Sequence, residues 1–412
     1  MKNAYMEEKE GLNYQTLVEE TSRCLLCLDA PCSKMCPAYT DPARFIRAVR
    51  FKNLKGAAEV IRENNALGSI CARVCPTERY CQKGCSRSGI DRPIDIGLIQ
   101  RYITDFEQKN DMHILKCEKD NGFKVAIIGS GPAGLETACL LKMKGYQVDI
   151  YEKEKQAGGY LRNGIPEYRL PNTIIDYEIK RITDLGVKIK LNAEVGKDIS
   201  FDDLKSKYDA VIVAIGYSES KSLEMFNDDK VILATTFLKE CKSKQGKINV
   251  KDNVVVIGGG DVAMDVVTSL KKIGVKNVTD VVYEKLDEFL ASKKELNEAR
   301  ENNVTIIDGY KPVEYKNGKI TFESRFIDSK LVIKADLVIL AVGQKMSDNH
   351  FDLPLINKGE IDIKNNYQIG ESNVFAVGDI TKGDKTVVYS IRRGKEVAFY
   401  VDSYLKAKGG KK

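Results

Sequence analysis

The stretch Lys124–Lys153, KVAIIGSGPAGLETACLLKMKGYQVDIYEK, decides the fold of this chain. An aliphatic run is followed by a glycine-rich turn, an apolar segment of helical length and a second aliphatic run, which is the order of a β-α-β unit. The stretch Asn253–Lys285, NVVVIGGGDVAMDVVTSLKKIGVKNVTDVVYEK, repeats this order and also ends in Tyr-Glu-Lys. We therefore expect an α/β protein with two Rossmann-like folds that arose by internal duplication.

The first unit carries a complete dinucleotide-binding fingerprint. Gly129, Gly131 and Gly134 have the spacing G-x-G-x-x-G, directly after the first strand and at the start of the helix. Glycines at these positions let the backbone approach a pyrophosphate, whose charge faces the helix N-terminus. Glu152 ends the second strand, where a carboxylate accepts hydrogen bonds from a ribose 2′-hydroxyl.

The second unit repeats the fingerprint with one change. Gly258 and Gly260 keep the first two positions, and Ala263 takes the third. The duplication places Glu284 where Glu152 stands, and we also assign Asp261 to this site. Two linked dinucleotide folds predict one flavin and one nicotinamide cofactor, FAD and NAD(H).

The end of the chain indicates which fold holds the flavin. The segment VFAVGD, with Gly378 and Asp379, follows a late strand and is expected to close over the first fold, although a Gly-Asp pair alone reads as a turn. We add Gly159 and Leu161, after the first unit, to the FAD site. No pair of cysteines occurs beyond Cys85, so thiol-disulfide chemistry against the flavin is not expected.

Cysteines are concentrated near the start of the chain. Eight of the eleven form two groups, Cys24-x2-Cys27-x4-Cys32-x3-Cys36-Pro37 and Cys71-x3-Cys75-Pro76-x5-Cys81-x3-Cys85. Close spacing with proline after the last cysteine of a run is a ferredoxin-like feature and predicts iron-sulfur clusters, in which the cysteine before proline often serves the other cluster. Structural zinc and disulfides are the alternatives, and disulfides are disfavoured in a reducing compartment.

Composition excludes several function classes. Lys and Arg number 65 against 59 Asp and Glu, and a net charge of +6 over 412 residues is too weak to indicate a nucleic-acid partner. Only two histidines occur, which argues against histidine-based catalysis, and we assign no catalytic side chain. The first residues, MKNAYMEEKE, lack a signal-peptide apolar run and no aliphatic run approaches membrane-spanning length, so we expect a cytoplasmic protein without membrane contact.

These patterns divide the chain into three predicted domains. Residues 1–121 form a helical domain that carries the cysteines, with a helical apolar period over Asp41–Asn65 and a polar linker over 107–124. Residues 122–220 and 335–412 form the FAD domain, and residues 221–334 form the NAD domain.

Nearly the whole chain resembles one family of iron-sulfur flavoproteins. This family includes the small subunit of bacterial glutamate synthase and the N-terminal part of dihydropyrimidine dehydrogenase. The stretches that carry the resemblance are SRCLLCLDAPC, KGAAEVIRENNALGSICARVCPTE, PIDIGLIQRYITDFEQ, GGYLRNGIPEYRLP, IGGGDVAMDV, LDEFLASKKE and GDKTVVYSI.

The resemblance implies two 4Fe-4S clusters with interleaved ligands. One would be held by Cys24, Cys27, Cys32 and Cys85, and the other by Cys36, Cys75, Cys81 and the side chain of Gln100. Cys71 would then be spare. Without the family, Gln100 reads as an ordinary polar helix residue.

The resemblance further implies the electron-input subunit of an NAD-dependent dihydropyrimidine dehydrogenase. Electrons from NADH would pass through FAD and the clusters to a separate FMN-containing subunit that reduces uracil or thymine. Relatives that use NADPH typically carry arginine where Glu284 stands, which predicts NADH here. The rival interpretations are a glutamate synthase small subunit-like donor to another partner and a zinc-binding interaction module.

Overall fold

The first dinucleotide fold is built on a parallel sheet of five strands in the order β15-β4-β1-β2-β3. We describe it from a computed structural model, in which residues 3–6, 8, 10–223, 226, 228–346, 351–356 and 359–409 are described. Two inner strands of this order, β4 and β1, are almost wholly aliphatic, as is typical of a parallel sheet that helices cover on both faces. The five strands are β1 (Lys124–Ile128), β2 (Gln147–Tyr151), β3 (Lys188–Lys190), β4 (Ala210–Val213) and β15 (Val374–Ala376).

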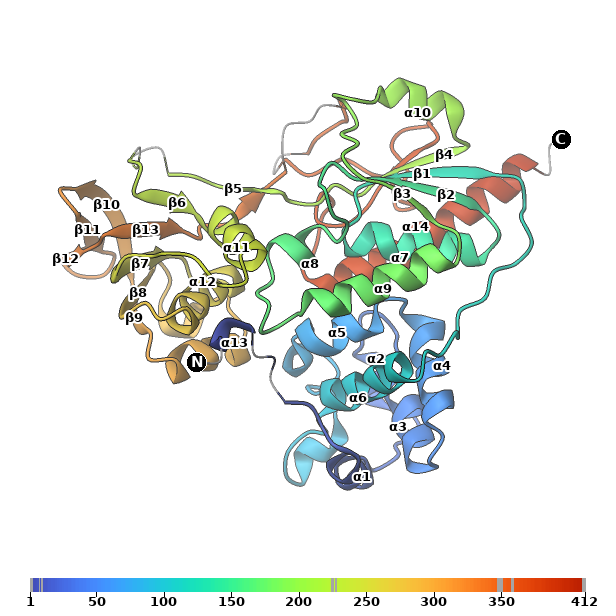
Figure 1. The fold of residues 1–412 in the computed structure, drawn as a ribbon, viewed down its shortest axis with the longest axis horizontal. Coiled ribbons are helices and arrows are strands. Elements are labelled where there is room, and N and C mark those ends of the chain that lie inside the picture. Colours follow the sequence, from blue (N-terminus) through green and yellow to red (C-terminus); the bar gives the residue numbers. More distant parts are fainter. Residues whose placement is uncertain are drawn as a thin grey trace. The chain divides into compact units, whose positions relative to one another are not determined.

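Two helices pack closely beneath the cofactor end of this sheet. Helix α7 (Pro132–Met143) follows β1, and α14 (Val387–Gly409) runs alongside it (Figure 1). They meet at Gly394, where a Cβ atom would lie 2.8 Å from the Ala133 carbonyl oxygen, so only glycine permits this approach. The other helices are α8 (Tyr160–Asn163), α9 (Asn172–Asp184) and α10 (Phe201–Lys207).

The second dinucleotide fold repeats the first sheet in the order β6-β13-β7-β8-β9. Strand β13 pairs with β7 in the way that β4 pairs with β1, so the duplication extends beyond the β-α-β unit. The predicted FAD domain began again at residue 335, and this boundary is wrong because β13 lies in the second sheet. The strands are β6 (Val231–Leu233), β7 (Asn253–Ile257), β8 (Asn277–Val282), β9 (Thr305–Asp308) and β13 (Leu337–Leu340).

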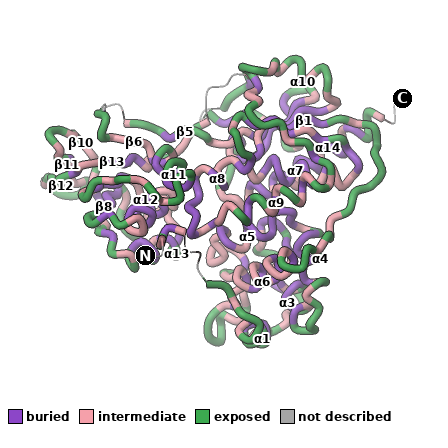
Figure 2. Tube along the Cα trace, in the orientation of Figure 1, coloured by how far each residue is buried: buried purple, intermediate pink, exposed green. Residues whose placement is uncertain are grey.

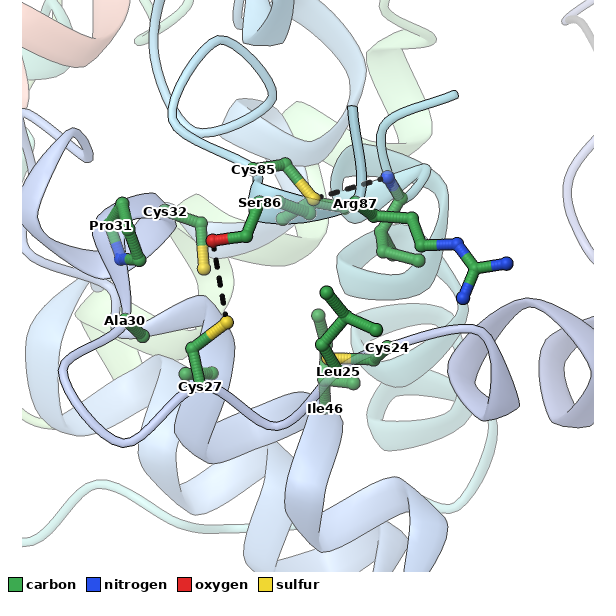
Figure 3. Close-up of a pocket in the computed structure, with 13 residues that line it drawn as sticks. Cys24, Leu25, Cys27, Ala30, Pro31, Cys32, Ile46, Cys85, Ser86 and Arg87 are labelled. Atoms are coloured by element: carbon green, nitrogen blue, oxygen red, sulfur yellow. Dashed lines mark hydrogen bonds between the residues drawn. The ribbon is translucent and has the colours of Figure 1, made fainter. Parts of the chain in front are cut away.

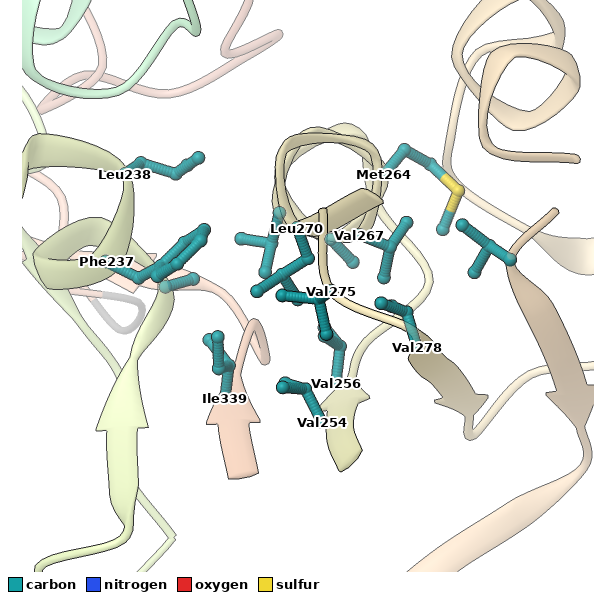
Figure 4. Packing of buried hydrophobic residues seen from close by; sticks show 14 of the residues in the cluster. Phe237, Leu238, Val254, Val256, Met264, Val267, Leu270, Val275, Val278 and Ile339 are labelled. Atoms are coloured by element: carbon teal, nitrogen blue, oxygen red, sulfur yellow. The ribbon is translucent and has the colours of Figure 1, made fainter. Parts of the chain in front are cut away.

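A core of aliphatic side chains joins this sheet to its helices (Figure 4). Helix α11 (Ala234–Ser243) contributes Phe237, and α12 (Asp261–Lys272) contributes Val267 and Leu270, all fully or almost fully buried. Helix α13 (Lys293–Glu301) follows.

An antiparallel sheet lies between β9 and β13 in sequence. It comprises β10 (Tyr310–Lys316), β11 (Lys319–Ser324) and β12 (Lys330–Lys334). A separate short pair is formed by β5 (Glu219–Ser220) and β14 (Gln344–Lys345).

The N-terminal region consists of short helices, as the sequence analysis expects. The period over Asp41–Asn65 is divided between two of them, because Lys52 adopts a φ of +59° and Asn53 caps the second helix by accepting from the Gly56 N–H at 2.8 Å. The helices are α1 (Tyr14–Ser22), α2 (Pro31–Lys34), α3 (Pro42–Arg50), α4 (Leu54–Asn64), α5 (Gly68–Val74) and α6 (Ile96–Lys109). Short 3₁₀ turns cover Ala4–Met6, Thr77–Arg79, Ser86–Gly89 and Leu286–Glu288.

The predicted linker begins too early. Residue Glu107 belongs to α6 and is fully buried. Its carboxylate accepts a hydrogen bond from Arg62 at 2.7 Å. Arg62 also donates to Glu178 on α9 at 2.9 Å, so the ion network joins the helical region to the first dinucleotide fold. A buried charge requires such partners, because an unpaired one costs several kcal/mol.

The chain accordingly divides into two compact units. One unit comprises Glu10–Leu161, Asn172–Gly216 and Asp348–Lys412, and the other comprises Met1–Lys9, Arg162–Pro171 and Tyr217–Ser347. Figure 2 shows buried residues along the central strands and helices of each unit. None of the helices formed by the described residues has the length and apolar character to cross a membrane.

Candidate cofactor sites

Four cysteines border one hollow in the helical region (Figure 3). Cys24, Cys27 and Cys32 come from the first cysteine group, and Cys85 comes from the end of the second. Apolar side chains, among them Leu25, Ile46 and Ile94, complete its lining. The fold thus brings together the four side chains that the resemblance assigned to one cluster.

The environment of these thiols suits ligands of a positively charged core. Burial, together with the neighbouring Cys85 and Cys24, raises the pKa of Cys32 to about 11. The backbone N–H of Ile94 donates to the Cys85 sulfur at 3.5 Å. Metal binding requires the thiolate form, so a metal held here would release protons from these thiols.

The other four cysteines of the two sequence groups lie near one another, and two of them, Cys71 and Cys81, are buried. Burial raises the pKa of Cys75 strongly, and nearby Cys71, Cys81 and Cys36 add to the effect. Gln100 is buried on α6, and its amide nitrogen donates to the Gly68 carbonyl, in the first turn of the helix that carries Cys71, at 2.8 Å.

Among the described residues, no group of three or more His, Cys, Asp or Glu side chains is gathered closely enough to hold a single metal ion.

In the first dinucleotide fold, two of the fingerprint glycines are required by close backbone contacts, and the third leaves space for a ligand. Gly129 has a φ of +104°, and a Cβ atom there would lie 2.5 Å from the Ala214 carbonyl oxygen. At Gly134 a Cβ atom would lie 2.2 Å from the Gly129 carbonyl oxygen. Gly131 caps α7 and faces open space, which is the cradle that a pyrophosphate requires.

The acid of the first fold is already organised by the protein. Glu152 is buried and accepts hydrogen bonds from the backbone N–H of Ser130 at 3.0 Å and from its hydroxyl. Its other oxygen accepts from the Glu154 N–H at 2.9 Å. This fixes the carboxylate at the end of β2, with acceptor capacity left for a ribose hydroxyl.

The late Gly-Asp pair returns to the first fold, as predicted. Strand β15 pairs with β4, and a Cβ atom at Gly378 would lie 3.2 Å from the Ala133 Cβ atom on α7. Burial raises the pKa of Asp379, whose carboxylate accepts from the Ser390 hydroxyl at 3.1 Å. Gly159 also approaches the fingerprint, since its Cβ atom would lie 2.9 Å from the Gly131 Cα atom, and Leu161 is fully buried.

The second fingerprint has the same steric pattern at its first two glycines. A Cβ atom at Gly258 would lie 2.4 Å from the Ala341 carbonyl oxygen, whereas Gly260 faces open space. Ala263 is fully buried, so α12 leaves room for a methyl group that α7 does not. Asp261 begins α12, and its carboxylate accepts from the Ser292 N–H at 2.6 Å.

Glu284 differs from its counterpart in burial. It is half-buried, and its carboxylate lies over the glycine turn, 3.2 Å from where a Cβ atom of Gly259 would stand. Among the ion pairs of the described residues, none includes Glu284. The structure therefore leaves a negative charge at the position where the ribose of a dinucleotide is expected.

Comparisons with known proteins agree with these sites. A family model described as dihydropyrimidine dehydrogenase domain II, 4Fe-4S cluster, matches residues 1–112, and one described as pyridine nucleotide-disulphide oxidoreductase matches residues 123–394. The NAD-dependent dihydropyrimidine dehydrogenase subunit PreT of Escherichia coli K12 is 50% identical over 388 residues, 94% of each chain. The chain belongs to the PreT family. This membership confirms the predicted fold class, oxidoreductase activity and FAD, NAD(H) and iron-sulfur cofactors.

More distant relatives share the architecture. The small chain of glutamate synthase [NADPH] from Escherichia coli is 31% identical over 431 residues, 94% of this chain and 91% of that one. A solved structure of FprA from Mycobacterium tuberculosis matches with a TM-score of 0.60 at 20% identity, over 70% of this chain and 86% of that one. The latter likeness shows the fold of the two dinucleotide regions alone.

Two features near the sites were not found by sequence reasoning. Ser130 donates hydrogen bonds to the Glu152 carboxylate. Its position inside the fingerprint is the sequence feature that could have indicated this role. Arg325 packs against Tyr283, beside Glu284, and the chain gives no local signal for this contact because 42 residues separate the two.

Proposed function

We propose that this chain is the electron-input subunit of an NAD-dependent dihydropyrimidine dehydrogenase. It would oxidise NADH and deliver electrons singly to a partner subunit that carries FMN and reduces uracil or thymine to the 5,6-dihydropyrimidine. The observation that carries the proposal is 50% identity to PreT over 94% of both chains, on a fold whose cysteines converge as the family requires.

The two dinucleotide folds would hold the two nucleotide cofactors. Bound FAD accepts a hydride as an electron pair, and iron-sulfur centres carry electrons one at a time. In the first fold Gly131 leaves the pyrophosphate space open and Glu152 meets the ribose. In the second fold Gly260 leaves the same space, and Glu284 opposes the 2′-phosphate of NADP(H) by charge repulsion.

The cysteines would hold two 4Fe-4S clusters. The hollow supports Cys24, Cys27, Cys32 and Cys85 as one ligand set. The second set is Cys36, Cys75, Cys81 and Gln100. Because the Gln100 amide nitrogen is engaged by the Gly68 carbonyl, the amide oxygen is the end left to bind iron.

One edge of the first ligand set reaches the surface. Leu28 directly follows Cys27 and is fully exposed, and Leu25 and Ile90 are also exposed. Exposed apolar side chains beside a redox site suit a protein interface through which an electron leaves. This supports a partner subunit as the acceptor.

The test uses the purified chain with and without a co-expressed partner. Alone, the holoprotein should oxidise NADH with ferricyanide and leave uracil unreduced; with the partner, NADH oxidation should depend on uracil. Uracil reduction by the chain alone would contradict the proposal. Dependence on glutamine and 2-oxoglutarate instead would favour the glutamate synthase-like alternative, whose relative is 31% identical.

A further inference from the structure

The turn between β11 and β12 is fixed beside the acid of the second fold. The backbone N–H of Arg325 donates to the Gly309 carbonyl at 2.9 Å, and the Gly309 N–H donates to the Glu284 carbonyl at 3.1 Å. These two backbone hydrogen bonds link the turn, through Gly309, to the end of β8. The first fold has α10 rather than a three-stranded sheet between β3 and β4, so this element distinguishes the nicotinamide fold.

Arg325 lies over an aromatic ring. Its guanidinium carbon lies 3.7 Å from the centre of the Tyr283 ring, and its Nη1 donates to the Tyr283 carbonyl at 2.8 Å. Both residues are exposed. Ordering a long surface side chain costs conformational entropy, and the ring and carbonyl together offset that cost. The guanidinium group also lies 5.2 Å from the centre of the Phe326 ring, and the residue as a whole stays exposed.

The second cation near Glu284 is engaged elsewhere. The Lys285 ammonium lies 4.3 Å from the centre of the Phe326 ring, and that ring packs against Gly309, where a Cβ atom would lie 2.7 Å from it. Lys285 is therefore not directed toward a phosphate at the ribose. The surroundings of Glu284 are shaped by two aromatic rings, each carrying a cation.

We propose that Arg325, stacked on Tyr283, is the surface on which the adenine of NADH binds. The inference rests on the proposed binding of NADH by the second fold, in which Glu284 marks the ribose that carries the base. Adenine needs a flat partner, and a guanidinium plane stacks on a base without discriminating its edges. Tyr283 orients the plane and Arg325 contacts the base.

The test separates the adenine half of the cofactor from the nicotinamide half. Steady-state oxidation by ferricyanide is measured with NADH and with reduced nicotinamide mononucleotide, which lacks adenosine, and AMP is used as a competitive inhibitor. In Arg325→Ala the KM for NADH and the inhibition constant of AMP should each rise about tenfold, with kcat unchanged. The kcat/KM for the mononucleotide should stay as in the wild type.

Two control variants complete the design. Arg325→Lys keeps the charge but not the plane, so its KM for NADH should approach that of Arg325→Ala. Lys285→Ala should leave the KM for NADH unchanged. Unchanged NADH and AMP constants in Arg325→Ala, or an equal loss with the mononucleotide, would overturn the inference. A wild-type protein that holds FAD but does not oxidise NADH would instead contradict the proposed function.

Discussion

The two dinucleotide folds have the same strand order but treat equivalent residues differently. Glu152 is buried and takes three hydrogen bonds from the protein, whereas Glu284 is half-buried and lies over an open turn. The third fingerprint position is Gly134 in one fold and a buried Ala263 in the other. The acid of the first fold is thus preorganised by protein hydrogen bonds, whereas the acid of the second fold is left more exposed.

The fifth residue of each dinucleotide helix shows how one duplicated position acquires two roles. Glu136 on α7 is fully buried and accepts from the Ala66 N–H at 3.1 Å, so it fastens the helical region to the first dinucleotide fold. Asp265 on α12 forms an ion pair with Arg169 at 2.6 Å, which fastens the segment 162–171 to the second dinucleotide fold. In both folds an acid on the cofactor helix anchors a segment from outside the sheet.

The largest expected effect is at the third fingerprint position. Gly134→Ala should abolish FAD binding, because its methyl group would meet the Gly129 carbonyl oxygen at 2.2 Å. The flavin absorbance of the purified variant measures this directly. The matched variant Ala263→Gly should keep full FAD and lose only about 1 kcal/mol of stability from helix propensity. Normal flavin content in Gly134→Ala would show that α7 can move away from the turn.

Reversing the charge of the second acid should change cofactor choice. Glu284→Arg should raise the ratio of kcat/KM for NADPH over NADH roughly a hundredfold, since a repulsion at the 2′-phosphate becomes an attraction. Partial exposure of the site keeps the change below what a buried pair would give. The control Glu152→Gln should lower FAD retention without moving this ratio. Preference for NADPH in the wild type would refute the role of Glu284.

Removing the two helix acids should have unequal effects on stability. Asp265→Asn should lower the free energy of unfolding by about 3 kcal/mol, because Arg169 remains buried with Glu295 as its remaining ionic partner. Glu136→Gln keeps a neutral acceptor for the Ala66 N–H and should cost less than about 1 kcal/mol. Thermal unfolding of the two variants at pH 5, where Glu136 is protonated, makes the comparison. Equal losses would contradict the division of roles.

The smallest effect concerns pH. Burial raises the pKa of Glu136 to about 7, and between about pH 4.5 and pH 7 the folded protein binds a proton that the unfolded chain has released. This contribution is present below that range and is lost as the pH rises through it. The wild type should therefore lose stability relative to Glu136→Gln between pH 5 and pH 8. Parallel unfolding temperatures over this range would exclude the assignment.

Local spacing was enough to predict much of the molecule. The fingerprints around Gly131 and Gly260 were identified because a pyrophosphate requires close backbone approach at a fixed spacing after a strand. The acids Glu152 and Glu284 followed from the same repeat. The position of β13 was not predicted, because a buried parallel strand carries no sequence mark of the sheet that it joins.

What the sequence by itself determined was the set of chemical groups and the two repeated folds that carry them. That Cys85 shares a ligand set with Cys24 followed only from the family resemblance, because 61 residues separate the two in the chain. The structure supports this pairing, since both side chains line the same hollow. Only the tertiary structure decided that Glu107 is a buried partner of Arg62 rather than part of a linker, and that Arg325 lies on Tyr283. The physical reason is that a repeated unit consists of residues that are neighbours in the chain, so its pattern can be recognised locally. The partner of a charge or a ring depends on which distant segments pack together and exclude water.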